Sequence, residues 1–126
     1  MRMDDEPLRV ALRVQQQAAE LGFDWPDVAA VWAKLDEEWR ELAEARHQSP
    51  QRCAEEWGDV LFTVVNLARH LGVEPVSALQ AANTRFAARF AAVEAAASTF
   101  PPVGDPARLA AMEACWQQAK RDLKAG

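Results

Sequence analysis

The 126-residue sequence has no excess of positive charge, no long apolar run and no regular alternation of apolar and polar residues. Its formal net charge is −5, so neither nucleic acid nor a membrane surface is expected as a general partner. No segment, the N-terminal MRMDDEPLRV included, offers the apolar stretch that a signal peptide or a membrane span needs. The missing alternation argues against β-strands.

Cysteine and histidine are scarce, with two of each in the chain. Cys53 and Cys115 form no CxxC pair and fall on apolar stretches of helical character. Together with the lack of a signal peptide, this predicts a reducing, cytoplasmic location. A di-iron carboxylate bundle needs two ExxH pairs. Only Glu44 and His47 form one, since Leu67 stands three before His70, so this class fails on ligand count.

Proline positions and apolar spacing predict the helices. Most of the seven prolines stand where a helix should begin, and Asp24, Ser49 and Asp105 are suited to cap three of the helices. Half of the residues are hydrophobic, and they recur at helical spacing. The sequence therefore predicts an all-α helical bundle forming a single domain over residues 1–126. Its five helices are expected at about 7–21, 26–46, 50–71, 75–98 and 106–124.

Two pairs of carboxylates are the most informative feature. Glu38 and Glu41 stand three apart, as do Glu56 and Asp59, and residues three apart share a helix face. The pairs are placed symmetrically about residues 47–50, which read as a turn, so a helical hairpin would bring all four carboxylates to one spot. Like charges repel at that range, and a cation among them removes the repulsion. Oxygen-only ligands favour Mg²⁺, with Mn²⁺ as the second candidate.

The acidic pairs belong to a longer pattern. KLDEEWREL at residues 34–42 and EEWGDVLF at 55–62 contain the acids as EExxE and ExxD. Further segments are GFDWPD at 22–27, VNLARHLGV at 65–73, ANTRFAARF at 82–90 and MEACWQQAK at 112–120. This combination covers nearly the whole chain. It resembles the MazG nucleotide pyrophosphohydrolases, in particular the C-terminal domain of full-length MazG.

The resemblance implies a hydrolase that converts a nucleoside triphosphate to the monophosphate and pyrophosphate, by water attack at the α-phosphorus. It also implies a homodimer, and it is compatible with a house-cleaning role on non-canonical nucleotides. Glu38, Glu41, Glu56 and Asp59 correspond to the metal ligands of the family. The metal would neutralise the phosphate oxygens and activate water. Glu37, the remaining acid of the motif, is either the base or water-orienting group, or a solvated surface glutamate.

Six residues are candidates for substrate binding: Lys34, Arg52, Asn83, Arg85, Arg89 and Lys120. Arg85 and Arg89 match the phosphate-contacting basic positions of the family, although Arg85 stands where lysine is usual. Lys34, Arg52 and Lys120 are equally compatible with ordinary surface roles.

Asn83 falls within the apolar arc of its helix, where a buried amide needs a partner. It could bind a ligand, orient a carboxylate or fix helix register. Phe23 and Trp25, beside a helix start, either stack on a base or pack against apolar neighbours. The alternative to an enzyme is a non-catalytic helical dimerisation or interaction module, in which the acids hold a structural divalent cation.

Overall fold

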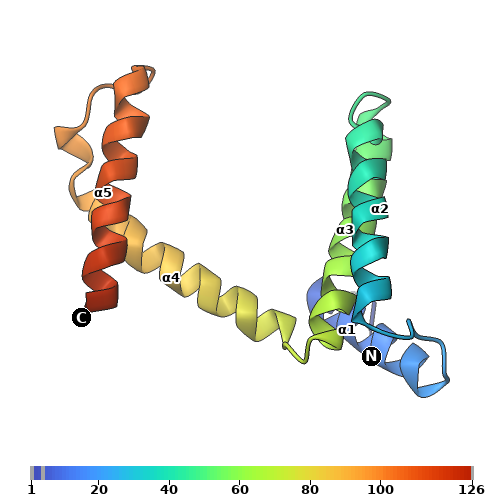
Figure 1. Cartoon of the computed structure of the whole chain (residues 1–126). Helices are drawn as coiled ribbons and strands as arrows, with labels where there is room; N and C mark the ends of the chain where they lie inside the picture. Colours follow the sequence, from blue (N-terminus) through green and yellow to red (C-terminus); the bar gives the residue numbers. More distant parts are fainter. Residues whose placement is uncertain (1, 4, 126) are drawn as a thin grey trace. The chain divides into compact units, whose positions relative to one another are not determined.

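The computed structural model describes the chain apart from residues 1, 4 and 126. The described part consists of α-helices and one short 3-10 helix, without a β-strand, which confirms the all-α prediction (Figure 1). The elements are α1 (Pro7–Glu20), α2 (Val28–Ala45), α3 (Pro50–His70), α4 (Pro75–Ala95), η1 (Ala97–Thr99) and α5 (Pro106–Ala125). The predicted boundaries are close to these, with the largest difference at the end of α4, where the last predicted turn is η1.

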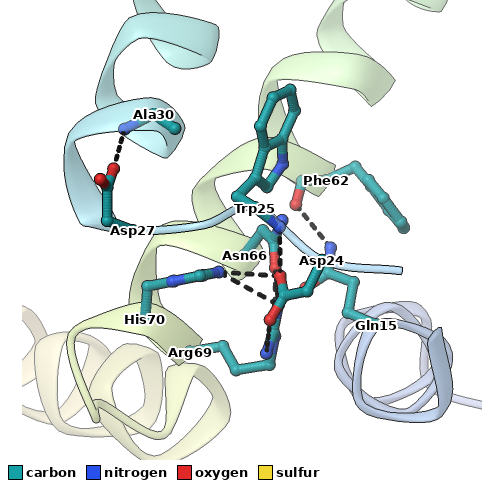
Figure 2. Close-up of polar contacts among 9 residues, drawn as sticks. All are labelled: Gln15, Asp24, Trp25, Asp27, Ala30, Phe62, Asn66, Arg69 and His70. Carbon is teal, nitrogen blue, oxygen red and sulfur yellow. Dashed lines mark hydrogen bonds and ion pairs between the residues drawn. The ribbon is translucent and has the colours of Figure 1, made fainter. Parts of the chain in front are cut away.

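Side-chain caps fix several helix starts. The Ser49 hydroxyl accepts a hydrogen bond from the backbone N–H of Arg52 at 3.1 Å, and a carboxylate oxygen of Asp105 accepts one from Ala107 at 2.9 Å. The expectation for Asp24 was wrong, because α2 is capped by Asp27, which accepts from the N–H of Ala30 at 2.9 Å (Figure 2). The carboxylate of Asp24 instead makes tertiary contacts with α3.

Two compact parts of the chain are described separately, residues 1–78 and residues 79–126. In the first part, α2 and α3 fold back on one another as a hairpin, and α1 packs against α3 (Figure 1). Val31 and Val65 are among the fully buried side chains of this part. The rings of Trp39 and Trp57 meet edge to face across the hairpin, with centroids 6.0 Å apart.

The second part contains most of α4, together with η1 and α5. Phe86 stacks on Phe90 and also contacts Trp116, with ring centroids 5.7 and 4.9 Å apart. The guanidinium of Arg89 lies 5.9 Å from the centre of the Trp116 ring. This distance falls within the range of a cation–π contact, so Arg89 is held beside the aromatic cluster.

Several large apolar side chains of the hairpin remain exposed. Trp32, Trp39, Trp57, Leu61 and Phe62 each keep about half of their surface open to solvent. A surface of this kind on neighbouring helices is typical of a protein–protein interface. None of the helices in the described part of the chain has the length and apolar character needed to cross a membrane.

Candidate functional site

The α2–α3 hairpin brings the acidic residues together. Carboxylate oxygens of Glu38, Glu56 and Asp59 all lie within 4.8 Å of one another. Glu37, Glu38 and Glu41 form a second group within the same distance, so Glu38 belongs to both. The mirror placement of the two pairs in the sequence therefore corresponds to their convergence in space.

The acids differ in their exposure to solvent. Glu38 and Glu56 are buried, with 5% and 4% of their surface exposed. Glu41 is half-buried, while Glu37 and Asp59 are exposed. Two carboxylates thus lie inside the hairpin, and the other three lie at its rim, where a ligand can reach them from solvent.

A basic side chain one turn earlier on the same helix pairs with each buried carboxylate. The Nζ of Lys34 lies 2.9 Å from Oε1 of Glu38, and Nη2 of Arg52 lies 2.7 Å from Oε1 of Glu56. Arg52 also reaches Oε2 of Glu55 at 2.8 Å. Hydrogen bonding to Glu38 raises the pKa of Lys34, and hydrogen bonding to Glu55, followed by the charge of Glu56, raises that of Arg52. Both bases are therefore firmly charged beside the acids.

The second oxygen of each buried carboxylate has no hydrogen-bond partner among the described residues. Oε2 of Glu38 and Oε2 of Glu56 are buried, and neither has a hydrogen-bond partner among the described residues. A buried charged oxygen without a partner is costly, and native structures rarely leave one unexplained. Carboxylate oxygens from two facing helices are the donor set that Mg²⁺ or Mn²⁺ prefers, so these residues fit a divalent cation.

The negative charges of the neighbouring acids affect the pKa of Glu41. Its pKa is raised, chiefly by the negative charge of Glu38, then by partial desolvation and by the charges of Glu56 and Glu37. Neither histidine belongs to the two acidic groups found in the described residues. Each of these two groups offers carboxylate oxygens alone as donors.

The candidate substrate-binding residues fall in both parts of the chain. Lys34 and Arg52 contact the acids directly. Asn83, Arg85 and Arg89 lie on α4 and Lys120 on α5, in the second part. The expectation that Asn83 is buried was wrong, because its side chain is exposed and needs no internal partner. The reason is that the apolar arc of α4 is itself largely open to solvent, as Leu79 and Phe86 show.

One polar cluster was not identified from the sequence. Asp24 contacts Arg69 and His70 of α3, Arg69 contacts Asn66, and Gln15 of α1 contacts the backbone of α3 (Figure 2). The segments GFDWPD and VNLARHLGV contain four of these five residues, but nothing in the sequence indicated that the two segments meet. No feature of the sequence indicated that Gln15 belongs to this cluster.

Comparison with known proteins assigns the chain to a family. A sequence profile of the MazG nucleotide pyrophosphohydrolase domain matches residues 27–90, about half of the chain and the part that holds Glu37, Glu38, Glu41, Glu56 and Asp59. The chain belongs to the MazG family. This membership confirms the resemblance seen in the sequence motifs.

Two curated MazG relatives align with nearly the whole chain. One is the nucleoside triphosphate pyrophosphohydrolase/pyrophosphatase MazG of Thermotoga maritima, 39% identical over 113 residues, which are 90% of this chain and 44% of that protein. The other is the nucleoside triphosphate pyrophosphohydrolase of Escherichia coli K12, 37% identical over 130 aligned positions, which cover 94% of this chain and 48% of that protein. The present chain thus spans just under half of the length of these MazG proteins.

Proposed function

We propose that this MazG-family chain is a metal-dependent nucleoside triphosphate pyrophosphohydrolase, which forms a nucleoside monophosphate and pyrophosphate. The observation that carries the proposal is the pair of unpartnered, buried oxygens of Glu38 and Glu56, beside the more exposed Glu41 and Asp59. The names of the two relatives give the reaction, and the acidic cluster gives a place where its metal can bind.

In this proposal Glu38, Glu41, Glu56 and Asp59 hold Mg²⁺, with Mn²⁺ as the second candidate. When bound, the ion neutralises phosphate oxygens and makes a bound water easier to deprotonate. Glu37 is exposed at the edge of the cluster, where its carboxylate can accept the proton of the attacking water. Oxygen from that water forms the new bond to the α-phosphorus, and pyrophosphate leaves.

The basic residues are assigned to the substrate. Lys34 and Arg52 already lie against the buried glutamates and have further N–H groups that can face phosphate oxygens. Arg85, Arg89 and Lys120, in the second part of the chain, are proposed to bind phosphates of the substrate, whose charge needs cations, either in the same chain or in the second copy of a homodimer. Asn83, exposed on α4, is proposed as a polar contact to the nucleotide.

A homodimer and a cytoplasmic location complete the proposal. The exposed tryptophans and aliphatic side chains of α2 and α3 supply an apolar surface suited to a second copy of the chain. The choice between canonical and non-canonical nucleotides, including a house-cleaning role, is left to the substrate panel below.

Product analysis with a matched pair of variants tests the activity. The protein is incubated with Mg²⁺ and a panel of canonical and modified nucleoside triphosphates, and monophosphate and pyrophosphate are quantified. Glu38→Gln is expected to abolish turnover and the rise in melting temperature caused by Mg²⁺. Glu44→Gln, the same change at an exposed position of α2 outside the acidic groups, should preserve both.

Two outcomes would contradict the enzyme assignment. Turnover that survives Glu38→Gln would mean that the acidic cluster is not the active site. Absence of turnover on every nucleotide, with the Mg²⁺-dependent rise in melting temperature retained by the wild type, would favour the alternative of a non-catalytic module with a structural cation.

A further inference from the structure

Each buried glutamate of the hairpin directly follows an exposed glutamate, and a cation one turn earlier on the same helix contacts both. The two groups are Lys34, Glu37 and Glu38 on α2, and Arg52, Glu55 and Glu56 on α3. Residues three and four apart lie on the same face of a helix, which is why one cation reaches both acids. Glu55 is the one member of these groups without a role in the function proposed above.

The two groups differ in how tightly the exposed glutamate is held. Oε2 of Glu55 lies 2.8 Å from Nη1 of Arg52, whereas Oε1 of Glu37 lies 3.4 Å from Nζ of Lys34. A guanidinium is planar and its N–H groups point in fixed directions, while an ammonium is a point charge with rotatable donors. The contact with Glu55 therefore constrains the orientation of its cation much more than the contact with Glu37 does. Glu37 is the freer of the two exposed acids.

Arg52 needs such a constraint because much of its side chain lies in solvent. The side chain of Arg52 is 50% exposed, against 32% for Lys34. A long exposed side chain has many rotamers, and a single hydrogen bond at one end does not fix the plane of its guanidinium. The second bond, from Nη1 to Glu55, supplies what is missing, so that Nη1 and Nη2 each have a carboxylate partner.

The guanidinium in turn determines which oxygen of Glu56 is free. The terminal torsion of a glutamate is broad and roughly two-fold, so a carboxylate without a fixed partner can rotate. Nη2 of Arg52 donates to Oε1 of Glu56 at 2.7 Å, and Oε2 is buried without a hydrogen-bond partner in the described part of the chain. Hydrogen-bond partners of this kind orient the carboxylates that bind metals.

From these contacts we infer that Glu55 is a positioning residue, which holds Arg52 so that Oε2 of Glu56 stays available to a divalent cation. The inference rests on metal binding by the acidic cluster in the function proposed above. Glu55 itself contacts Arg52 and acts through it. Because Glu55 and Arg52 are both half-exposed, their ion pair contributes little to the stability of the fold, and its effect is on metal binding instead.

Two substitutions of Glu55 separate its hydrogen bond from its charge. Glu55→Gln and Glu55→Ala both remove the charge, but glutamine retains an oxygen that can accept from Nη1 of Arg52. Mn²⁺ is titrated into each protein without nucleotide, and the electron paramagnetic resonance signal of the free ion gives the Kd. Glu55→Ala should raise this Kd about tenfold, at the lower end of the effect of outer partners on metal affinity. Glu55→Gln should raise it about twofold or less, and both variants should keep the melting temperature of the wild type in EDTA.

A double-mutant cycle tests whether Glu55 acts through Arg52. Arg52→Met keeps the apolar stem of the side chain and removes the guanidinium. In that background Glu55→Ala should change the Kd for Mn²⁺ by about twofold or less, since no guanidinium remains for Glu55 to hold. With Arg52 present, Glu55→Ala should raise the Mg²⁺ concentration for half-maximal nucleotide turnover about tenfold, whereas kcat at saturating Mg²⁺ should stay close to that of the wild type.

Three results among the variants would overturn the inference. The first is the same Kd in Glu55→Ala as in the wild type, and the second is an equal loss of affinity in Glu55→Ala and Glu55→Gln, which would indicate an effect of charge alone. The third is a loss that persists in the Arg52→Met background. Failure of the proposed function gives a different result, because a wild type that binds Mn²⁺ but hydrolyses no nucleotide is not the proposed enzyme, while the Mn²⁺ titrations still decide the role of Glu55. A wild type that binds neither Mn²⁺ nor Mg²⁺ would overturn both.

Discussion

Asp24 clamps the segment between α1 and α2 onto α3, and its replacement by asparagine tests that clamp. Oδ2 of Asp24 accepts from Nη1 of Arg69 at 3.1 Å, Oδ1 accepts from Nη2 of the same guanidinium, and Nε2 of His70 lies 2.9 Å from Oδ1 (Figure 2). This fork is the geometry in which arginine and carboxylate bind most strongly. Asparagine keeps the size of the side chain but has one acceptor oxygen and no charge.

The expected loss of stability follows from the number of contacts and their exposure. A hydrogen bond to a charged group contributes about 1.5–3 kcal/mol, and Asp24→Asn weakens more than one such bond. The side chain of Asp24 is 25% exposed, so solvent screens part of this effect. We therefore expect the free energy of unfolding to fall by about 1–2 kcal/mol at pH 7. Asp27→Asn is the matched control, because asparagine caps a helix as well as aspartate does and the change should be near neutral.

The stability difference between the wild type and Asp24→Asn should change with pH in one direction. Hydrogen bonds from Arg69 hold the pKa of Asp24 well below its usual range, helped by His70 and the N–H of Trp25 and opposed by partial desolvation. In the unfolded chain the pKa is about 3.9. A lowered pKa in the folded state stabilises the fold fully above that value and progressively less as the pH falls below it. The difference between wild type and Asp24→Asn should thus be constant from pH 7 to about 5 and shrink below about pH 4.

Urea unfolding followed by circular dichroism at pH 7, 5 and 3 measures this difference, with a common slope for all variants as the check that the unfolded states are comparable. Two results would refute the clamp. One is equal stability of Asp24→Asn and Asp27→Asn at pH 7. The other is a difference between wild type and Asp24→Asn that stays the same from pH 7 to pH 3, since the carboxylate charge would then play no part.

Three further changes test the hairpin and its ends. Arg52→Ala should lower the melting temperature, because it leaves the buried Glu56 without its cationic partner. Added Mg²⁺ should reduce this loss of melting temperature relative to the wild type. A loss that Mg²⁺ leaves unchanged would argue against an ion at Glu56. Ser49→Ala should cost about 1 kcal/mol in urea unfolding, because α3 loses its cap, and an unchanged midpoint would contradict this role. Gly72→Ala should destabilise by about 1 kcal/mol, since Gly72 has φ +72°, whereas Gly58→Ala within α3 should stabilise by about 0.5–1 kcal/mol; the opposite order would refute both expectations.

The fold and the acidic cluster could be predicted because both depend on local spacing. Proline and cap positions determine where the helices begin, and a turn near Ser49 is enough to place Glu38 against Glu56 and Asp59. What spacing could not supply was the burial of each acid. Glu38 and Glu56 are covered and Asp59 is exposed, a difference that depends on how neighbouring helices pack rather than on position along one helix.

The contacts of Gln15 and Asp24 with α3 could not be predicted, because these residues meet their partners only through the tertiary fold. Gln15 lies in a run of three glutamines and bonds to the carbonyl of Phe62, 47 residues away in sequence. Asp24 has the local features of a helix cap, but its contacts with Arg69 and His70 outweigh that preference, and Asp27 takes the capping position. Local preference is a weak guide wherever a charged partner from another helix is within reach.

The placement of Lys34 and Arg52 explains how the hairpin tolerates its two buried acids. Each base precedes its buried glutamate by one turn, and because α2 and α3 form an antiparallel hairpin, Lys34 lies toward the open end of the hairpin and Arg52 toward the turn. The two cations therefore flank the acids along the hairpin, and each neutralises one oxygen of a buried carboxylate while the other oxygen stays unpartnered. In the function proposed above, folding and metal binding would thus use different oxygens of the same two residues, and the cation would not have to break the ion pairs that stabilise the hairpin.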